Sequence, residues 1–88
     1  MPNNVHELIA DECRVLALFL TEKNIAYGNS FAEPIHAFSK LPAVEQLKVR
    51  IDDKLNRMVK GQEYPGDDTL KDLAGYYILL KVLERLDV

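Results

Sequence analysis

The sequence predicts an all-α fold in which three main amphipathic helices form a small bundle. Two observations predict this class: apolar residues recur at three- and four-residue steps in three long segments, and none of these segments alternates as a β-strand does. A third is the 48% hydrophobic and 28% charged composition, which is typical of a chain that folds. We expect residues 1–88 to form one domain. Domains this short bury a smaller share of their surface than larger domains do, so we expect oligomerisation to complete the bundle.

The first helix is expected over residues 5–24, where apolar residues follow the helical period. Asn4 and Glu7 stand at the spacing of an N-terminal capping pair. Residues 25–41 form a long connection, and connections beyond about 12 residues are often functional unless they contain structure. We therefore expect a short helical turn at 33–38.

The second helix is expected over residues 42–60, because Pro42 suits a first helical turn and Gly61 suits a C-terminal stop. A turn follows, after which Asp67 is expected to cap a third helix that runs to residue 86. The predicted core draws on all three helices. It consists of Leu16, Phe19, Leu47, Ile51, Leu55, Leu73, Tyr77 and Leu80.

Charge and composition exclude several classes of protein. The net charge of −3 does not provide the broad basic surface that duplex nucleic acid requires. The longest apolar run is far shorter than a membrane span of about 18 residues. The single cysteine, Cys13, cannot form an internal disulfide, and its place on an apolar stripe predicts a small buried residue. The sequence therefore predicts a cytoplasmic protein that binds neither membranes nor duplex nucleic acid.

The first part of the third helix carries two carboxylates of interest. Asp68 and Asp72 lie four residues apart on an apolar flank, where like charges oppose the helix by about 0.2–0.5 kcal/mol. A metal ion or a Lys or Arg side chain would compensate. The alternative is structural, since the helix dipole favours acidic residues in a first turn, but this explains Asp68 better than Asp72. On the second helix, Asp53 and Arg57 have the spacing of an ordinary exposed ion pair.

Three blocks of sequence resemble a known group of proteins. They are KNxxYGNSF at 23–31, RIDDKLNR at 50–57 and DTLKDLAGY at 68–76. Together they resemble small phage and prophage proteins of the nucleotide modification associated domain 1 type, over about residues 15–80. The resemblance implies a protein that handles a nucleotide or another small phosphate-bearing ligand.

More distantly, the arrangement is similar to the all-α MazG-type nucleoside triphosphate pyrophosphohydrolases. Those proteins carry a Glu-x-x-Glu block and a Glu-x-x-Asp block, where this chain has Asp53-x-x-Asn56 and Thr69-x-x-Asp72. Only Asp72 matches outright. This resemblance implies Mg²⁺ held by Asp53, Asp68 and Asp72. It also implies phosphate contacts from Lys54 and Arg57 and base stacking on Tyr27 or Tyr76.

Two functions follow as hypotheses. The first is a phage-type nucleotide-handling protein, pyrophosphohydrolase-like if it is active, in which Mg²⁺ activates a water against a triphosphate. The second is a non-catalytic helical module that binds another protein, such as a phage-encoded inhibitor or accessory factor. An enzyme needs its carboxylates converged on one point, whereas a binding module does not. The two apolar flanks of the third helix also predict a homo-oligomer.

Overall fold

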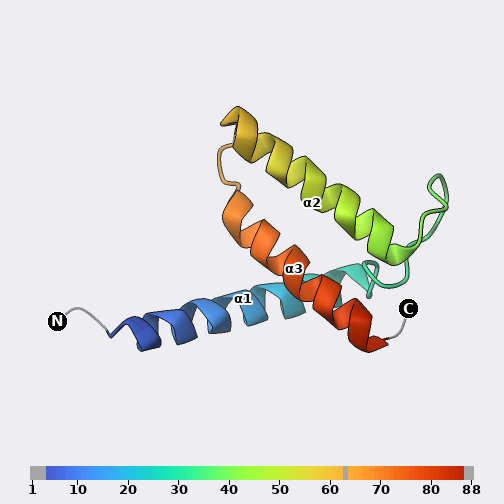
Figure 1. Cartoon of the computed structure of the whole chain (residues 1–88). Helices are drawn as coiled ribbons and strands as arrows, with labels where there is room; N and C mark the ends of the chain where they lie inside the picture. The colour runs from blue at the N-terminus through green and yellow to red at the C-terminus, as the bar shows by residue number, and fades with distance from the viewer. Residues whose placement is uncertain (1–3, 63, 87–88) are drawn as a thin grey trace.

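The computed structural model describes residues 4–62 and 64–86, and these residues form three α-helices without a β-strand. The helices are α1 (Val5–Tyr27), α2 (Ala43–Lys60) and α3 (Thr69–Leu86), shown in Figure 1. The all-α prediction is confirmed. Within the described residues, no helix is long and apolar enough to cross a membrane.

The helix α3 is the centre of the arrangement, because it packs against α2 on one side and α1 on another. Helices α2 and α3 form an antiparallel pair, and α1 crosses α3 with its C-terminal half (Figure 1). The N-terminal half of α1 extends beyond this contact. The result is an elongated molecule with principal extents of 52 × 32 × 21 Å.

The buried core lies mainly between α2 and α3. Leu47, Ile51 and Leu73 are buried as predicted, and Leu83, which is not among the predicted core residues, joins them. Predicted core residues Leu16, Phe19 and Leu80 are half-buried. Since burial of apolar area is the main source of stability, the α2–α3 pair is the best-stabilised part of the fold.

The core prediction was wrong for two residues, which are exposed and not buried. Leu55 is 40% exposed and Tyr77 is 50% exposed. The buried face of α2 carries Leu47 and Ile51, and Leu55 lies at the edge of that face. Tyr77 lies on α3, half of it exposed. A sequence period identifies the apolar face of a helix, but the number of neighbouring helices decides how much of it is covered.

Capping interactions explain where α1 begins and where α1 and α2 end. The Oδ1 atom of Asn4 accepts a hydrogen bond of 2.7 Å from the His6 backbone N–H, as the capping prediction requires. Helix α1 continues beyond the predicted residue 24 and stops at Gly28, whose φ of 60° is left-handed. Helix α2 stops at Gly61, with φ of 66°, as predicted.

Two local predictions were wrong. Asp68, and not Asp67, caps α3, since the Lys71 backbone N–H donates to Asp68 Oδ1 at 3.0 Å. The Asp67 carboxylate instead pairs with Arg57 at 3.5 Å. The short helix expected at 33–38 is also not formed, because hydrogen-bonded turns occupy 28–32 and an irregular segment follows.

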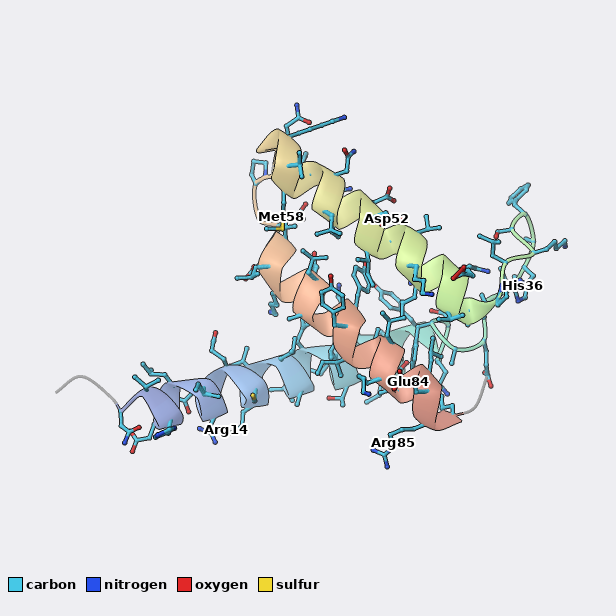
Figure 2. All side chains as sticks on the ribbon, in the orientation of Figure 1. Arg14, His36, Asp52, Met58, Glu84 and Arg85 are labelled. Carbon is cyan, nitrogen blue, oxygen red and sulfur yellow. The ribbon has the colours of Figure 1, made fainter. Side chains whose placement is uncertain are left out.

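The N-terminal half of α1 is exposed to solvent. No residue of α1 is fully buried, and Cys13 is exposed, so the prediction of a buried cysteine was wrong. The reason is that α3 crosses α1 only near its C-terminal half, which leaves the apolar residues of the first turns uncovered. Figure 2 shows Arg14 on this free part of α1 and Asp52 on α2, both directed away from the helix contacts.

Candidate functional site

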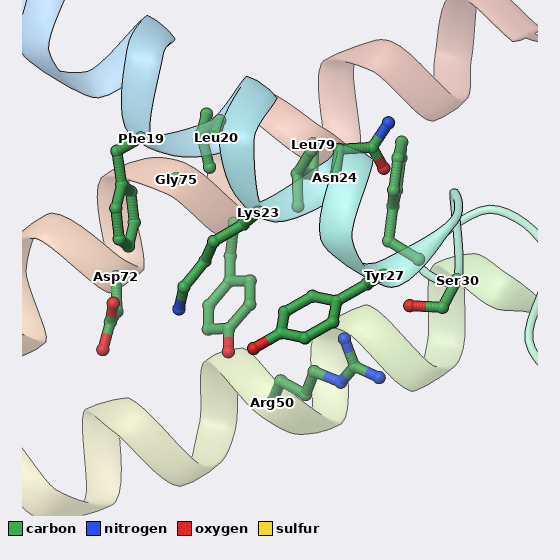
Figure 3. A pocket seen from close by; sticks show the side chains of 12 residues that line it. Phe19, Leu20, Lys23, Asn24, Tyr27, Ser30, Arg50, Asp72, Gly75 and Leu79 are labelled. Atoms are coloured by element: carbon green, nitrogen blue, oxygen red, sulfur yellow. The ribbon is translucent and has the colours of Figure 1, made fainter.

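A pocket of about 110 Å³ lies where the C-terminal end of α1 meets the middle of α3, with one side chain from α2 (Figure 3). Pockets that enclose a whole small ligand usually measure about 300–1,000 Å³, so this one has room for only part of a ligand. The pocket is lined by Phe19, Leu20, Lys23, Asn24, Tyr27, Ser30, Phe31, Arg50, Asp72, Gly75, Tyr76 and Leu79. Most of these residues fall in the three blocks that carry the family resemblance.

The first sequence block, residues 23–31, forms one edge of the pocket and is held by local hydrogen bonds. Gly28 and Asn29 both have left-handed backbones, with φ of 60° and 61°, which turn the chain sharply at the end of α1. The Asn24 side-chain amide donates to Asn29 Oδ1 at 2.6 Å and holds this turn against the helix. The turn therefore positions Tyr27 and Phe31 around one cavity.

The inner wall of the pocket depends on a glycine at the crossing of α1 and α3. Gly75 is buried, and a Cβ atom built on it would lie 2.9 Å from Leu20 Cδ2. The missing side chain therefore allows α1 to approach α3 closely. Leu20 and Leu79 complete an apolar inner wall.

The mouth of the pocket is cationic. Lys23, Tyr27 and Arg50 are exposed and line the pocket. In Figure 3 the Lys23 side chain extends toward Phe19 and Asp72, and the Arg50 side chain lies beside Tyr27 and extends toward Ser30. Within residues 4–62 and 64–86, no ion pair joins Lys23 or Arg50 to a carboxylate. The Lys23 ammonium lies 4.7 Å from the centroid of the Phe19 ring, a cation–π contact that holds it beside the pocket.

Asp72 also lines the pocket, but its charge is already compensated. The Lys54 Nζ atom lies 3.1 Å from Asp72 Oδ2, and these side chains are only 15% and 20% exposed. Sequence reasoning left open whether a metal ion or a basic side chain would compensate Asp72, and the structure shows Lys54 in that position. The two exposed cations at the mouth are thus the uncompensated charges of the pocket.

The three carboxylates predicted as metal ligands do not share a contact. Asp72 pairs with Lys54, Asp68 caps α3, and Asp53 is exposed on α2. Among the residues that the structure describes, no group of three or more His, Cys, Asp or Glu side chains is placed to hold a metal ion. The single chain therefore does not bring Asp53, Asp68 and Asp72 together as one set.

Of the residues predicted to contact the ligand, two line the pocket and two do not. Tyr27 and Tyr76, expected to stack on a base, both line the pocket. Lys54 and Arg57, expected to contact phosphate, do not line it, since Lys54 pairs with Asp72 and Arg57 lies at the turn between α2 and α3. Sequence reasoning missed the two cations of the mouth. Lys23 and Arg50 stand at the start of the first and second of the three sequence blocks.

Comparisons of this chain with known protein families, with curated proteins and with solved structures found no match.

Proposed function

We propose that the pocket binds a nucleotide, with the base held among the aromatic side chains and the phosphate at the cationic mouth. One observation carries the proposal: the same small cavity combines an apolar inner wall, four aromatic neighbours and two exposed cations. The aromatic neighbours are Phe19, Tyr27, Phe31 and Tyr76. Ligand sites of this kind are mostly apolar, with a few polar groups that fix the orientation.

The apolar inner wall and the cationic mouth together orient the ligand, with its ring inside the pocket and its phosphate at the mouth. The wall formed by Leu20, Gly75 and Leu79 favours a flat apolar ring, and the pocket volume limits the inserted part to about that size. The guanidinium of Arg50 presents a planar set of donors that matches two phosphate oxygens, and the Lys23 ammonium adds a second charge. A hydrogen bond to a charged group contributes about 1.5–3 kcal/mol, so phosphate contacts provide much of the affinity.

Hydrolysis of the bound nucleotide is a separate prediction that rests on the resemblance alone. It requires Mg²⁺, and magnesium sites use oxygen ligands together with substrate phosphates. The binding proposal does not depend on that metal, because its contacts come from Lys23, Arg50 and the aromatic side chains. Measuring binding with and without Mg²⁺ separates the two ideas.

A thermal-shift screen of nucleosides, nucleoside phosphates and inorganic phosphate tests the proposal. A ligand at 100 times its dissociation constant adds about 2.7 kcal/mol to the stability of the folded state. We expect nucleoside phosphates to raise the melting temperature more than either the nucleoside or phosphate alone. No shift with any nucleotide at millimolar concentration contradicts the proposal.

Two pocket variants and a matched control refine the test. Arg50→Gln should weaken nucleoside phosphate binding about 10- to 100-fold, as expected for loss of a charge-assisted hydrogen bond, and should leave nucleoside binding nearly unchanged. Tyr27→Leu should weaken both ligands. Arg85→Gln removes the same charge from the exposed last turn of α3, where the Arg85 side chain points away from the pocket (Figure 2), and should change neither.

A further inference from the structure

The helix α3 lines one side of the pocket with a carboxylate and an apolar wall. Gly75, Tyr76 and Leu79 follow Asp72 in the sequence at helical spacings, so the four residues share one face of the helix. Among the described residues that line the pocket, Asp72 carries the only carboxylate. A flat ring that rests on the wall at Gly75 therefore has one edge directed at the Asp72 side chain, about one helical turn away.

The Asp72 carboxylate has one oxygen held by a neighbour and one that is not. Oδ2 lies 3.1 Å from the Lys54 Nζ atom. In the part of the chain that the structure describes, no hydrogen bond or ion pair engages Oδ1. The Asp72 side chain is also largely shielded from water. A carboxylate oxygen in these surroundings is a strong acceptor for an N–H group of a ligand.

The cations near Asp72 leave this acceptor open to the pocket. Lys54 does not line the pocket, so the carboxylate of the ion pair meets the ligand and the ammonium does not. The Lys23 ammonium lies 4.7 Å from the centroid of the Phe19 ring and forms no ion pair with Asp72. Arg50 extends away from Asp72 in Figure 3, which puts the proposed phosphate contact and the acceptor at different ends of the pocket.

We propose that Asp72 selects bases with an exocyclic amino group, such as cytosine and adenine, by accepting a hydrogen bond at Oδ1. This inference rests on the nucleotide binding proposed above. The amino groups of cytosine and adenine are donors at the edge of the ring, and acidic side chains accept from the cytosine amino group in nucleic-acid recognition. Uracil and hypoxanthine have a carbonyl oxygen at that position, which would face the carboxylate with no hydrogen between the two acceptors. The ring N–H of uracil is a poor substitute, because it lies between two carbonyl oxygens.

Two matched pairs of ligands test the proposal on the full chain. CMP and UMP, and likewise AMP and IMP, have the same sugar and phosphate and differ by an amino group in place of a carbonyl. In NMR titrations without Mg²⁺, CMP and AMP should bind about 10- to 100-fold more tightly than UMP and IMP, as expected for one hydrogen bond to a charged group. Equal affinities within each pair overturn the selection by Asp72 and leave nucleotide binding in place. No binding of any of the four ligands overturns both proposals.

Two variants break the same ion pair and differ in whether they keep the carboxylate. In Asp72→Asn, the amide oxygen is expected to face the Lys54 ammonium and the amide N–H groups the pocket, so the preference for amino-bearing bases should disappear or reverse. Lys54→Met keeps the carboxylate and should keep the preference. Far-UV circular dichroism establishes that each variant retains its helices. A folded Asp72→Asn variant with the full wild-type preference, or a folded Lys54→Met variant without it, overturns the proposal.

Discussion

Removing one partner of the Lys54–Asp72 ion pair should destabilise the fold, because each charge is largely shielded from water. At the observed Nζ–Oδ2 distance of 3.1 Å, an effective dielectric constant of about 20 gives an attraction of about 5 kcal/mol. Desolvation of the two groups offsets much of this attraction. Breaking fully buried pairs costs about 3–5 kcal/mol, and the 15–20% exposure here lowers the expected cost of Asp72→Asn to about 1–3 kcal/mol.

A double-mutant cycle measures this coupling directly. Urea unfolding of Lys54→Met, Asp72→Asn and the double variant should give a coupling energy of about 1–2 kcal/mol, with the double variant more stable than Asp72→Asn alone. The exposed Lys48–Glu45 pair, at 3.4 Å, is the matched control and should give less than about 0.5 kcal/mol. A coupling energy for Lys54–Asp72 no larger than that control would refute the reasoning. A coupling energy that disappears in moderate salt, as the coupling energy of exposed pairs does, would also refute it.

Substitutions at three further positions test the packing and capping of the helices, each by urea unfolding. Leu47→Ala should cost about 2–5 kcal/mol, since Leu47 is 1% exposed between α2 and α3, and a cost below 1 kcal/mol would place the core elsewhere. Gly75→Ala should be nearly neutral, because the gain of about 1 kcal/mol in helix propensity offsets a small movement of Leu20, whereas Gly75→Leu should cost about 1–3 kcal/mol and abolish nucleotide binding. Asn4→Ala should cost about 1 kcal/mol and reduce helicity at the start of α1, and unchanged helicity would contradict the cap.

Features set by a few neighbouring residues were predictable from the sequence. Asn4 as the cap of α1 and Gly61 as the stop of α2 depend on local backbone geometry, which residue types reveal. The helical periods also identified Leu47, Ile51 and Leu73 correctly as buried. These predictions required no knowledge of how the helices are arranged.

Features that depend on the arrangement of helices were predicted less well. Leu55 and Cys13 lie on apolar faces, yet they are exposed because α3 covers only part of α2 and α1. Tyr77 is exposed because α1 and α2 together cover only part of α3. Spacing along the chain likewise could not show that Lys54 rather than a metal ion compensates Asp72, since the two residues come from different helices. For the same reason, the mouth of the pocket was missed, as it joins Lys23 of α1 to Arg50 of α2.

An NMR titration of the ¹⁵N-labelled protein with a nucleoside monophosphate tests the proposed binding site most directly. We expect the largest amide shift changes at 19–31 and 72–79, with a change in the Arg50 side-chain signal and only small changes at the α2–α3 turn. Changes centred on the turn near Arg57, where two other surface hollows lie, would contradict the proposed site. A spectrum that stays the same at millimolar ligand would contradict nucleotide binding itself.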